Sequence, residues 1–335
     1  MNSSKSKNKQ FVILTLFAMT LVVIGHSDIT NDFKDLWIYN WVYSFHMPLF
    51  FFISGSLFAL TMTQDRMKQT PFIEFIKKKA IRLLIPFIFI NTIIFSIKAF
   101  VIRDSSLMQN PIEPTLESLL DATFFHPIGF MWFLPCLFVI FLFSFPLYKY
   151  FKIRNLKLGE VILFIVIIVF SIFNNFLPII DLMRFSPAIH FISYFLLGII
   201  YYEYKSQVDY LFKKFWFIII PLFLGISVSL QAGEKIAALS GIIFSVGLAL
   251  LLEEKCTEQL IKISGYCYLV FLLSYFPQML IRGPISHLYT EINQYVFSAL
   301  SFIFGLSLPI LFGIFYSRLK EKNNLVKRSG ILIGL

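Results

Sequence analysis

Apolar residues fall along the chain in ten long runs, separated by short segments where charged and turn-forming residues gather. The runs lie near residues 11–26, 41–62, 81–102, 128–148, 159–177, 186–202, 215–230, 236–252, 263–281 and 294–317. A membrane-spanning helix needs about 20 mostly apolar residues, and most of the runs approach that length. The pattern therefore predicts an all-α, polytopic integral membrane bundle of about ten transmembrane helices.

Composition agrees with a protein that is dissolved in lipid. Hydrophobic residues make up 58% of the 335 residues, 42 of them are Phe, and only 14% are charged, against about 25% in globular domains. The first apolar run ends within LVVIGHSDITNDFKDLWIYN (21–40). This segment lacks the small-residue cleavage site of a signal peptide, so we expect the first helix to be retained. The three Cys residues show neither a disulfide framework nor a metal-binding spacing, and we expect no metal.

The basic residues set the expected orientation. With the N-terminus inside, 23 of the 29 Lys and Arg residues fall in inner segments, as the positive-inside rule requires. We therefore expect a cytoplasmic tail at 1–10, a membrane domain at 11–317 and a second cytoplasmic tail at 318–335. The net charge of +10 then faces anionic inner-leaflet lipid, so membrane lipid is the expected partner and nucleic acid is not.

All five histidines lie on the outer side of this topology. Ionisable groups inside a membrane usually face the bundle interior or a water-filled cavity, and His exchanges a proton most readily near neutral pH. We expect His26 and His46 to share such a cavity, with Asp28 as a carboxylate partner of His26. A single His could equally be an ordinary interfacial residue.

The second run carries YSFHMPLFFFISGSLF at residues 43–58. Helical spacing places Ser54 at the edge of the His46 face. Pro48 is expected near the helix start, where proline is tolerated or kinks the first turn. Ser54 and Gly55 are small enough to let a neighbouring helix backbone approach closely.

The inner side carries Lys77, Lys78, Lys79 and Arg82 at the entrance to the third run. These cations are either positive-inside anchors or a cradle for phosphate, which Lys and Arg bind well. Trp132 begins the fourth run, where Trp is ordinarily an interfacial belt residue.

Several of these segments together resemble a known family. The segments LVVIGHS (21–27), FHMPLFFFISGSLF (45–58), KKKAIRLLIPFIF (77–89) and MWFLPCLF (131–138) resemble the membrane acyltransferase-3 family. The likeness is greatest to its branch of fucose 4-O-acetylases and other polysaccharide O-acetyltransferases. The segment ISGYCYLVFLLSYFP (263–277) resembles a late segment of the same family more weakly, so the resemblance covers most of the chain.

The resemblance implies transfer of an acetyl or other acyl group from cytoplasmic acetyl-CoA to a carbohydrate hydroxyl on the far side of the membrane. By position, His26 is the implied catalytic base, and His46 belongs to the branch-specific signature. Lys77, Lys78, Lys79 and Arg82 match the basic segment that would hold the donor, and Trp132 matches the fourth helix. Two positions depart from the family pattern: Thr15 stands where Arg or Lys is usual, and Ser274 where His is usual.

The leading hypothesis is therefore an O-acyltransferase in the bacterial cytoplasmic membrane, acting on a cell-envelope polysaccharide or a lipid-linked sugar. His26 would take the acceptor proton, with Asp28 or His46 fixing its tautomer. Ser54 or Trp132 would donate to the thioester oxygen, and Thr15 would line the site. Either the donor arm reaches across the membrane or an acyl-enzyme relay is needed. The alternative is an exporter of an oligosaccharide or a small acylated molecule, because prolines interrupt several of the apolar runs.

Overall fold

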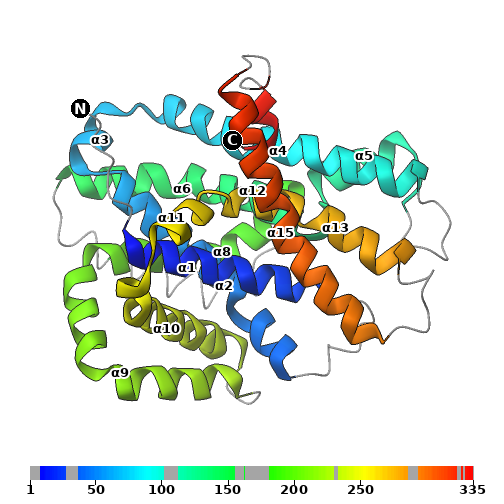
Figure 1. Cartoon of the computed structure of the whole chain (residues 1–335). Helices are drawn as coiled ribbons and strands as arrows, with labels where there is room; N and C mark the ends of the chain where they lie inside the picture. The colour runs from blue at the N-terminus through cyan, green and yellow to red at the C-terminus, as the bar shows by residue number, and fades with distance from the viewer. Residues whose placement is uncertain are drawn as a thin grey trace.

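The computed structural model describes residues 8–27, 37–101, 112–154, 162, 181–229, 233–285, 293–322, 326 and 329–334. In these residues every regular element is a helix (Figure 1). The elements are α1 (Lys9–Gly25), α2 (Trp37–Thr61), α3 (Gln64–Gln69), α4 (Phe72–Ser96), η2 (Ile97–Val101), α5 (Leu116–Phe124), η3 (Gly129–Trp132), α6 (Phe133–Arg154), η5 (Leu182–Arg184), α8 (Phe185–Glu203), α9 (Lys205–Val228), α10 (Glu234–Leu252), η6 (Glu253–Lys255), α11 (Glu258–Ser264), α12 (Cys267–Leu273), α13 (Tyr275–Leu280), η7 (Ile281–Ile285), α15 (Gln294–Lys320) and η8 (Gly330–Ile333).

The all-α membrane fold is confirmed. Among the described residues, seven helices are long and apolar enough to cross a membrane, or eight if the bent pair at Glu258–Ser264 and Cys267–Gly283 forms one span. The apolar helix α1, with 17 residues, is shorter. The expected helix at 159–177 falls almost entirely outside the described residues, so the number ten stays a prediction. The protein is an integral membrane protein.

Side-chain contacts fix the two ends of the bundle. At one end, Lys149 in the last turns of α6 donates to the carbonyl of Thr70, just before α4, at 2.7 Å. Lys152 pairs there with Glu203 at the end of α8, at 2.6 Å. At the other end, the Asn91 amide of α4 donates to the Ala122 carbonyl of α5 at 2.8 Å. We call the first the cation end, and the second the histidine end, because His26, His46 and His190 lie there.

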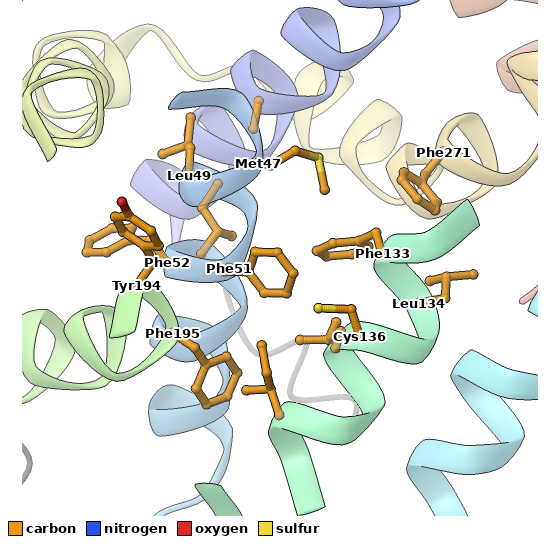
Figure 2. Close-up of a cluster of buried hydrophobic side chains, with 14 of the residues drawn as sticks. Met47, Leu49, Phe51, Phe52, Phe133, Leu134, Cys136, Tyr194, Phe195 and Phe271 are labelled. Carbon is orange, nitrogen blue, oxygen red and sulfur yellow. The ribbon is translucent and has the colours of Figure 1, made fainter. Parts of the chain in front are cut away.

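Helix α2 runs through the middle of the bundle and packs on α1, α8 and α10. Its Phe51 and Leu49 are fully buried, and Figure 2 shows apolar side chains of α2 filling the space between α6 and α8. The crossing of α2 and α8 is very close: a Cβ at Gly55 would lie 1.9 Å from the carbonyl oxygen of Phe195. The close approach expected at Gly55 is therefore present.

The position of Pro48 differs from the sequence expectation. Helix α2 begins at Trp37, so Pro48 lies well inside it rather than in its first turn. Proline has no N–H, so the Ser44 carbonyl lacks the helical donor that would normally satisfy it. The predicted run began near residue 41, which is too late, because the first turn of α2 (WIYN) is less apolar than the residues that follow.

Candidate functional site

A cavity of about 600 Å³ lies at the histidine end of the bundle. Its lining residues come from α1, α2, η3, α8, α9 and α10, which bring together segments from most of the chain. They are His26, Asn40, Trp41, Tyr43, Ser44, His46, Met47, Pro48, Trp132, His190, Phe191, Tyr194, Ser227, Val228, Ser229, Gly233, Glu234, Ala237 and Ala238. The exposed residues Asn40 and Glu234 lie at its rim, and His46, only 3% exposed, lies at its depth.

The ring of His46 is held by the helix that carries it. Its Nδ1 lies 2.8 Å from the carbonyl oxygen of Val42, one turn earlier in α2. A carbonyl oxygen only accepts hydrogen bonds, so Nδ1 must be the protonated nitrogen of the neutral ring. The lone pair then belongs to Nε2, and a neutral imidazole fixed in this way can accept a proton.

Tyr43 joins the two histidines. Its ring packs edge-on against His46 at 4.9 Å between centroids, and against His26 at 6.2 Å. Its hydroxyl donates to the carbonyl oxygen of Gly25 at 2.9 Å, one of the carbonyls at the end of α1 that the helix itself leaves unpaired. Tyr43 therefore ties the end of α1 to the first half of α2 at the two candidate catalytic rings.

His26 is the residue that ends α1, and two other segments support it. Phe130 packs against its ring at 4.9 Å between centroids. Gln278 of α13, fully buried, donates to the Val23 carbonyl at 3.0 Å and to the Ser27 hydroxyl at 3.2 Å. The end of α1 is thus held from three sides, by α2, by the η3 turn and by α13.

Aromatic rings and small polar groups form the rest of the wall. Trp132 packs against Phe191 of α8 at 5.5 Å between centroids. On the other side, the indole N–H of Trp41 donates to the hydroxyl of Ser227 in α9 at 2.9 Å. A cavity with aromatic walls and a few fixed polar groups is the usual form of a small-molecule site, and aromatic rings suit the apolar faces of a sugar.

The predicted site did not include several residues that line the cavity, among them Trp41, Tyr43, His190, Tyr194 and Glu234, although His190 was one of the five outer histidines. His190 carried a usable signal, because it begins an apolar run on the outer side. The aromatic residues carried none, since Trp and Tyr are common at helix ends in membranes. Glu234 opens α10 after Gly233, and its place beside α8 depends on how the helices pack.

Three predicted site residues lie elsewhere or are not described. Ser54 is half-buried on α2 but does not line the cavity; the neighbouring Ser56 donates to the Gly198 carbonyl of α8 at 2.9 Å. The Thr15 hydroxyl donates to the Phe11 carbonyl of its own helix at 2.7 Å, also away from the cavity. Asp28 lies outside the described residues. Of the predicted set, the cavity brings together His26, His46 and Trp132.

The four predicted donor-binding cations lie toward the cation end but on different faces of α4. Lys77 and Lys78 are exposed, and Lys78 pairs with Glu74 one turn away at 2.5 Å. Lys79 points inward, with its ammonium 3.9 Å from the ring centre of Phe141. Arg82 lies over the ring of Tyr268 at 5.9 Å.

The cation end and the cavity are far apart. Trp132 lies directly before α6 and Lys149 lies in the last turns of α6, so the two residues are about 25 Å apart along the helix axis. Phe141, which Lys79 covers, lies near the middle of α6. The ammonium of Lys79 therefore lies between the cation end and the cavity.

Comparison with known proteins places the chain in a family. Residues 13–318 match the acyltransferase-3 family, whose description is "Acyltransferase domain". A curated relative, "Nodulation protein NolL" of Mesorhizobium japonicum, is 31% identical over 130 residues, which cover 37% of this chain and 31% of that protein. The match thus spans about a third of the relative's length. No solved structure matches.

Proposed function

Because this chain belongs to the acyltransferase-3 family, we propose that it is an O-acyltransferase of the bacterial cytoplasmic membrane. It moves an acetyl group from cytoplasmic acetyl-CoA to a hydroxyl of a cell-surface or lipid-linked carbohydrate. The observation that carries this proposal is the cavity at the histidine end, where His26 and His46 from two helices line one space with aromatic rings and hydroxyls.

The reaction needs a base, because a sugar hydroxyl is a poor nucleophile at neutral pH. In the proposed mechanism His26 takes the hydroxyl proton while the oxygen attacks the thioester carbonyl carbon. The C–S bond then breaks, and the CoA thiolate recovers the proton from the imidazolium. The products are an O-acetyl ester and CoA, so atoms and charges balance.

His46 is proposed as the second imidazole of the pair. Its Nδ1 contact with Val42 leaves Nε2 as a fixed acceptor at the depth of the cavity. From there it can hold the acceptor hydroxyl or orient His26 through the shared contact with Tyr43. Trp132, whose indole N–H is a donor, is the predicted oxyanion partner that remains on the cavity wall.

The donor would enter from the cation end, with its phosphates near Lys77, Lys78, Lys79 and Arg82. The inward position of Lys79 supports a path from that end into the bundle. About 25 Å separates the cation end from the cavity along α6. An extended donor arm or an acyl-enzyme relay would span it.

The test is acetyl transfer from radiolabelled acetyl-CoA to surface glycan in membranes that contain the protein. We expect His26→Ala to lower the rate at least 100-fold and His46→Ala also to lower it strongly, since a positioned base typically contributes 10²–10⁴-fold. His126→Ala is the matched control. His126 is 61% exposed, pairs with Asp121 at 2.8 Å and lines a different hollow beside α5, so this variant should keep full activity.

Two outcomes would contradict the proposal. Full activity of correctly folded His26→Ala protein would remove the assigned base. Absence of label transfer by the wild type, together with glycan export that depends on the protein, would favour the exporter alternative.

A further inference from the structure

The cavity has an uneven charge. Among its described lining residues Glu234 is the only carboxylate, and none is Lys or Arg. The other polar lining groups are neutral hydroxyls, an amide, indoles and the three imidazoles. A ligand that enters this space therefore meets a negative charge at the rim and, among the lining residues that the structure describes, no cation to balance a charge of its own.

Glu234 faces the aromatic side of the cavity. It is the first residue of α10 and follows Gly233, whose φ of +74° turns the chain into the helix. It lines the same cavity as His190 and Tyr194 of α8 and acts on both electrostatically. A carboxylate in the first turn of a helix is favourable in any case. Its position on the cavity wall is what gives it a further role.

Two cations act near the cavity without lining it. Lys235 follows Glu234 and acts electrostatically on His190. Arg282 of η7 acts electrostatically on His26. Neither belongs to the described lining residues, so a ligand inside the cavity contacts the Glu234 carboxylate but not these two charges.

We propose that Glu234 makes the acceptor site selective for uncharged sugar units and against sugars that carry a carboxylate or phosphate. This inference rests on the proposed function and names the acceptor class of the same site. A carboxylate accepts strong hydrogen bonds from neutral hydroxyls. It repels an anionic substituent brought into the same cavity, and specificity often comes from such unfavourable contacts.

The size of the effect follows from Coulomb's law. At the rim the dielectric constant lies between the values for protein and for water. Repulsion between two like charges about 6 Å apart then lowers the binding affinity about tenfold. Because Glu234 is exposed, salt should screen this repulsion, and the discrimination should shrink at high ionic strength.

The experiment uses the purified full chain, radiolabelled acetyl-CoA and matched acceptors. The pairs are p-nitrophenyl glucoside with p-nitrophenyl glucuronide, and the galactoside with the galacturonide, which differ at the sixth carbon only. We expect the wild type to favour the neutral member about tenfold or more in kcat/KM. Glu234→Gln should bring the ratio to within about threefold of unity, and Glu234→Asp should keep it. Lys235→Gln is the control and should not abolish the preference.

The possible failures can be told apart. Equal use of both members by the wild type, or an unchanged ratio in Glu234→Gln, overturns the role of Glu234 while the proposed function stands. Preference for the uronides overturns the acceptor class. Absence of transfer by the wild type both to every acceptor and to surface glycan overturns the proposed function itself. Glu234→Asp separates loss of charge from loss of folding, because it keeps the carboxylate.

Discussion

The two histidines of helices α1 and α2 are positioned by different means. His46 is fixed by its own helix through Val42, whereas His26 shows no hydrogen bond to its ring among the described residues. The neighbours of His26 hold the backbone instead: Tyr43 bonds to Gly25, and Gln278 bonds to Val23. The position of the His26 ring therefore depends on the contacts that these neighbours make, and Tyr43 touches both rings.

Tyr43→Phe tests this positioning role. The variant keeps the ring contacts and removes the bond to the Gly25 carbonyl, which is worth about 1 kcal/mol. We expect kcat for acetyl transfer to fall about fivefold with KM for the acceptor little changed, because the base is less well placed while the cavity wall is intact. Steady-state kinetics with labelled acetyl-CoA measures both constants.

Tyr39→Phe is the matched control, since Tyr39 stacks on Tyr43 at 4.2 Å between centroids and lies outside the cavity lining. It should behave as wild type. An equal loss in the two variants would show that the Tyr43 hydroxyl has no particular role.

The packing of α2 on α8 sets the position of His46 and of the aromatic wall together. His46 lies on α2, while His190, Phe191 and Tyr194 lie on α8. Gly55 and Gly198 let the two backbones touch: a Cβ at Gly198 would lie 2.0 Å from the Phe52 carbonyl oxygen. The sequence anticipated a close approach at Gly55. It could not identify Ser56, rather than Ser54, as the serine that bonds across the crossing, because both are small residues on an apolar helix.

Gly55→Ala should separate these two helices. The added methyl would lie 1.9 Å from the Phe195 carbonyl oxygen, and this clash can be relieved only if the backbone moves. Overpacking of this kind costs about 1–3 kcal/mol. We expect a lower melting temperature in detergent and loss of acetyl transfer. Thermal unfolding followed by circular dichroism measures the first.

Gly225→Ala in α9 is the comparison. Nothing lies within 4 Å of a Cβ at Gly225, and Ala favours a helix over Gly by about 1 kcal/mol. This variant should therefore be as stable as the wild type or more so. A Gly55→Ala protein with an unchanged melting temperature would contradict the close crossing of α2 and α8.

At the scale of the whole molecule, basic side chains and imidazole rings lie at opposite ends of the bundle. Cations gather at one end of the helices and imidazoles at the other, about 25 Å apart along α6. With the positive-inside rule, this polarity predicts that the cation end faces the cytoplasm and the cavity faces outward. A donor made inside the cell and an acceptor outside it would then approach the same bundle from opposite sides.

Cysteine labelling tests this orientation. The three native cysteines are buried, whereas the side chains of Lys78 and His126 are 69% and 61% exposed at the two ends. With a membrane-impermeant maleimide on intact cells, we expect His126→Cys to be labelled and Lys78→Cys to be labelled only after permeabilisation. The wild type measures the background. The reverse pattern would invert the topology and place the cavity inside.

The sequence by itself determined the membrane fold, and it predicted both the polarity of charge and the choice of His26 and His46 as candidate site residues. These properties are local: the apolar runs are contiguous, the basic residues flank them, and each histidine interrupts a segment suited to lipid. Only the tertiary structure decided which residues share the cavity. Tyr43, His190 and Glu234 line it, whereas Thr15 and Ser54 do not. The physical reason is that helices apolar on every side carry no stripe that tells which face turns inward. Their rotation and neighbours are set by close contacts between distant segments, such as Gly55 on Phe195 and Trp41 on Ser227.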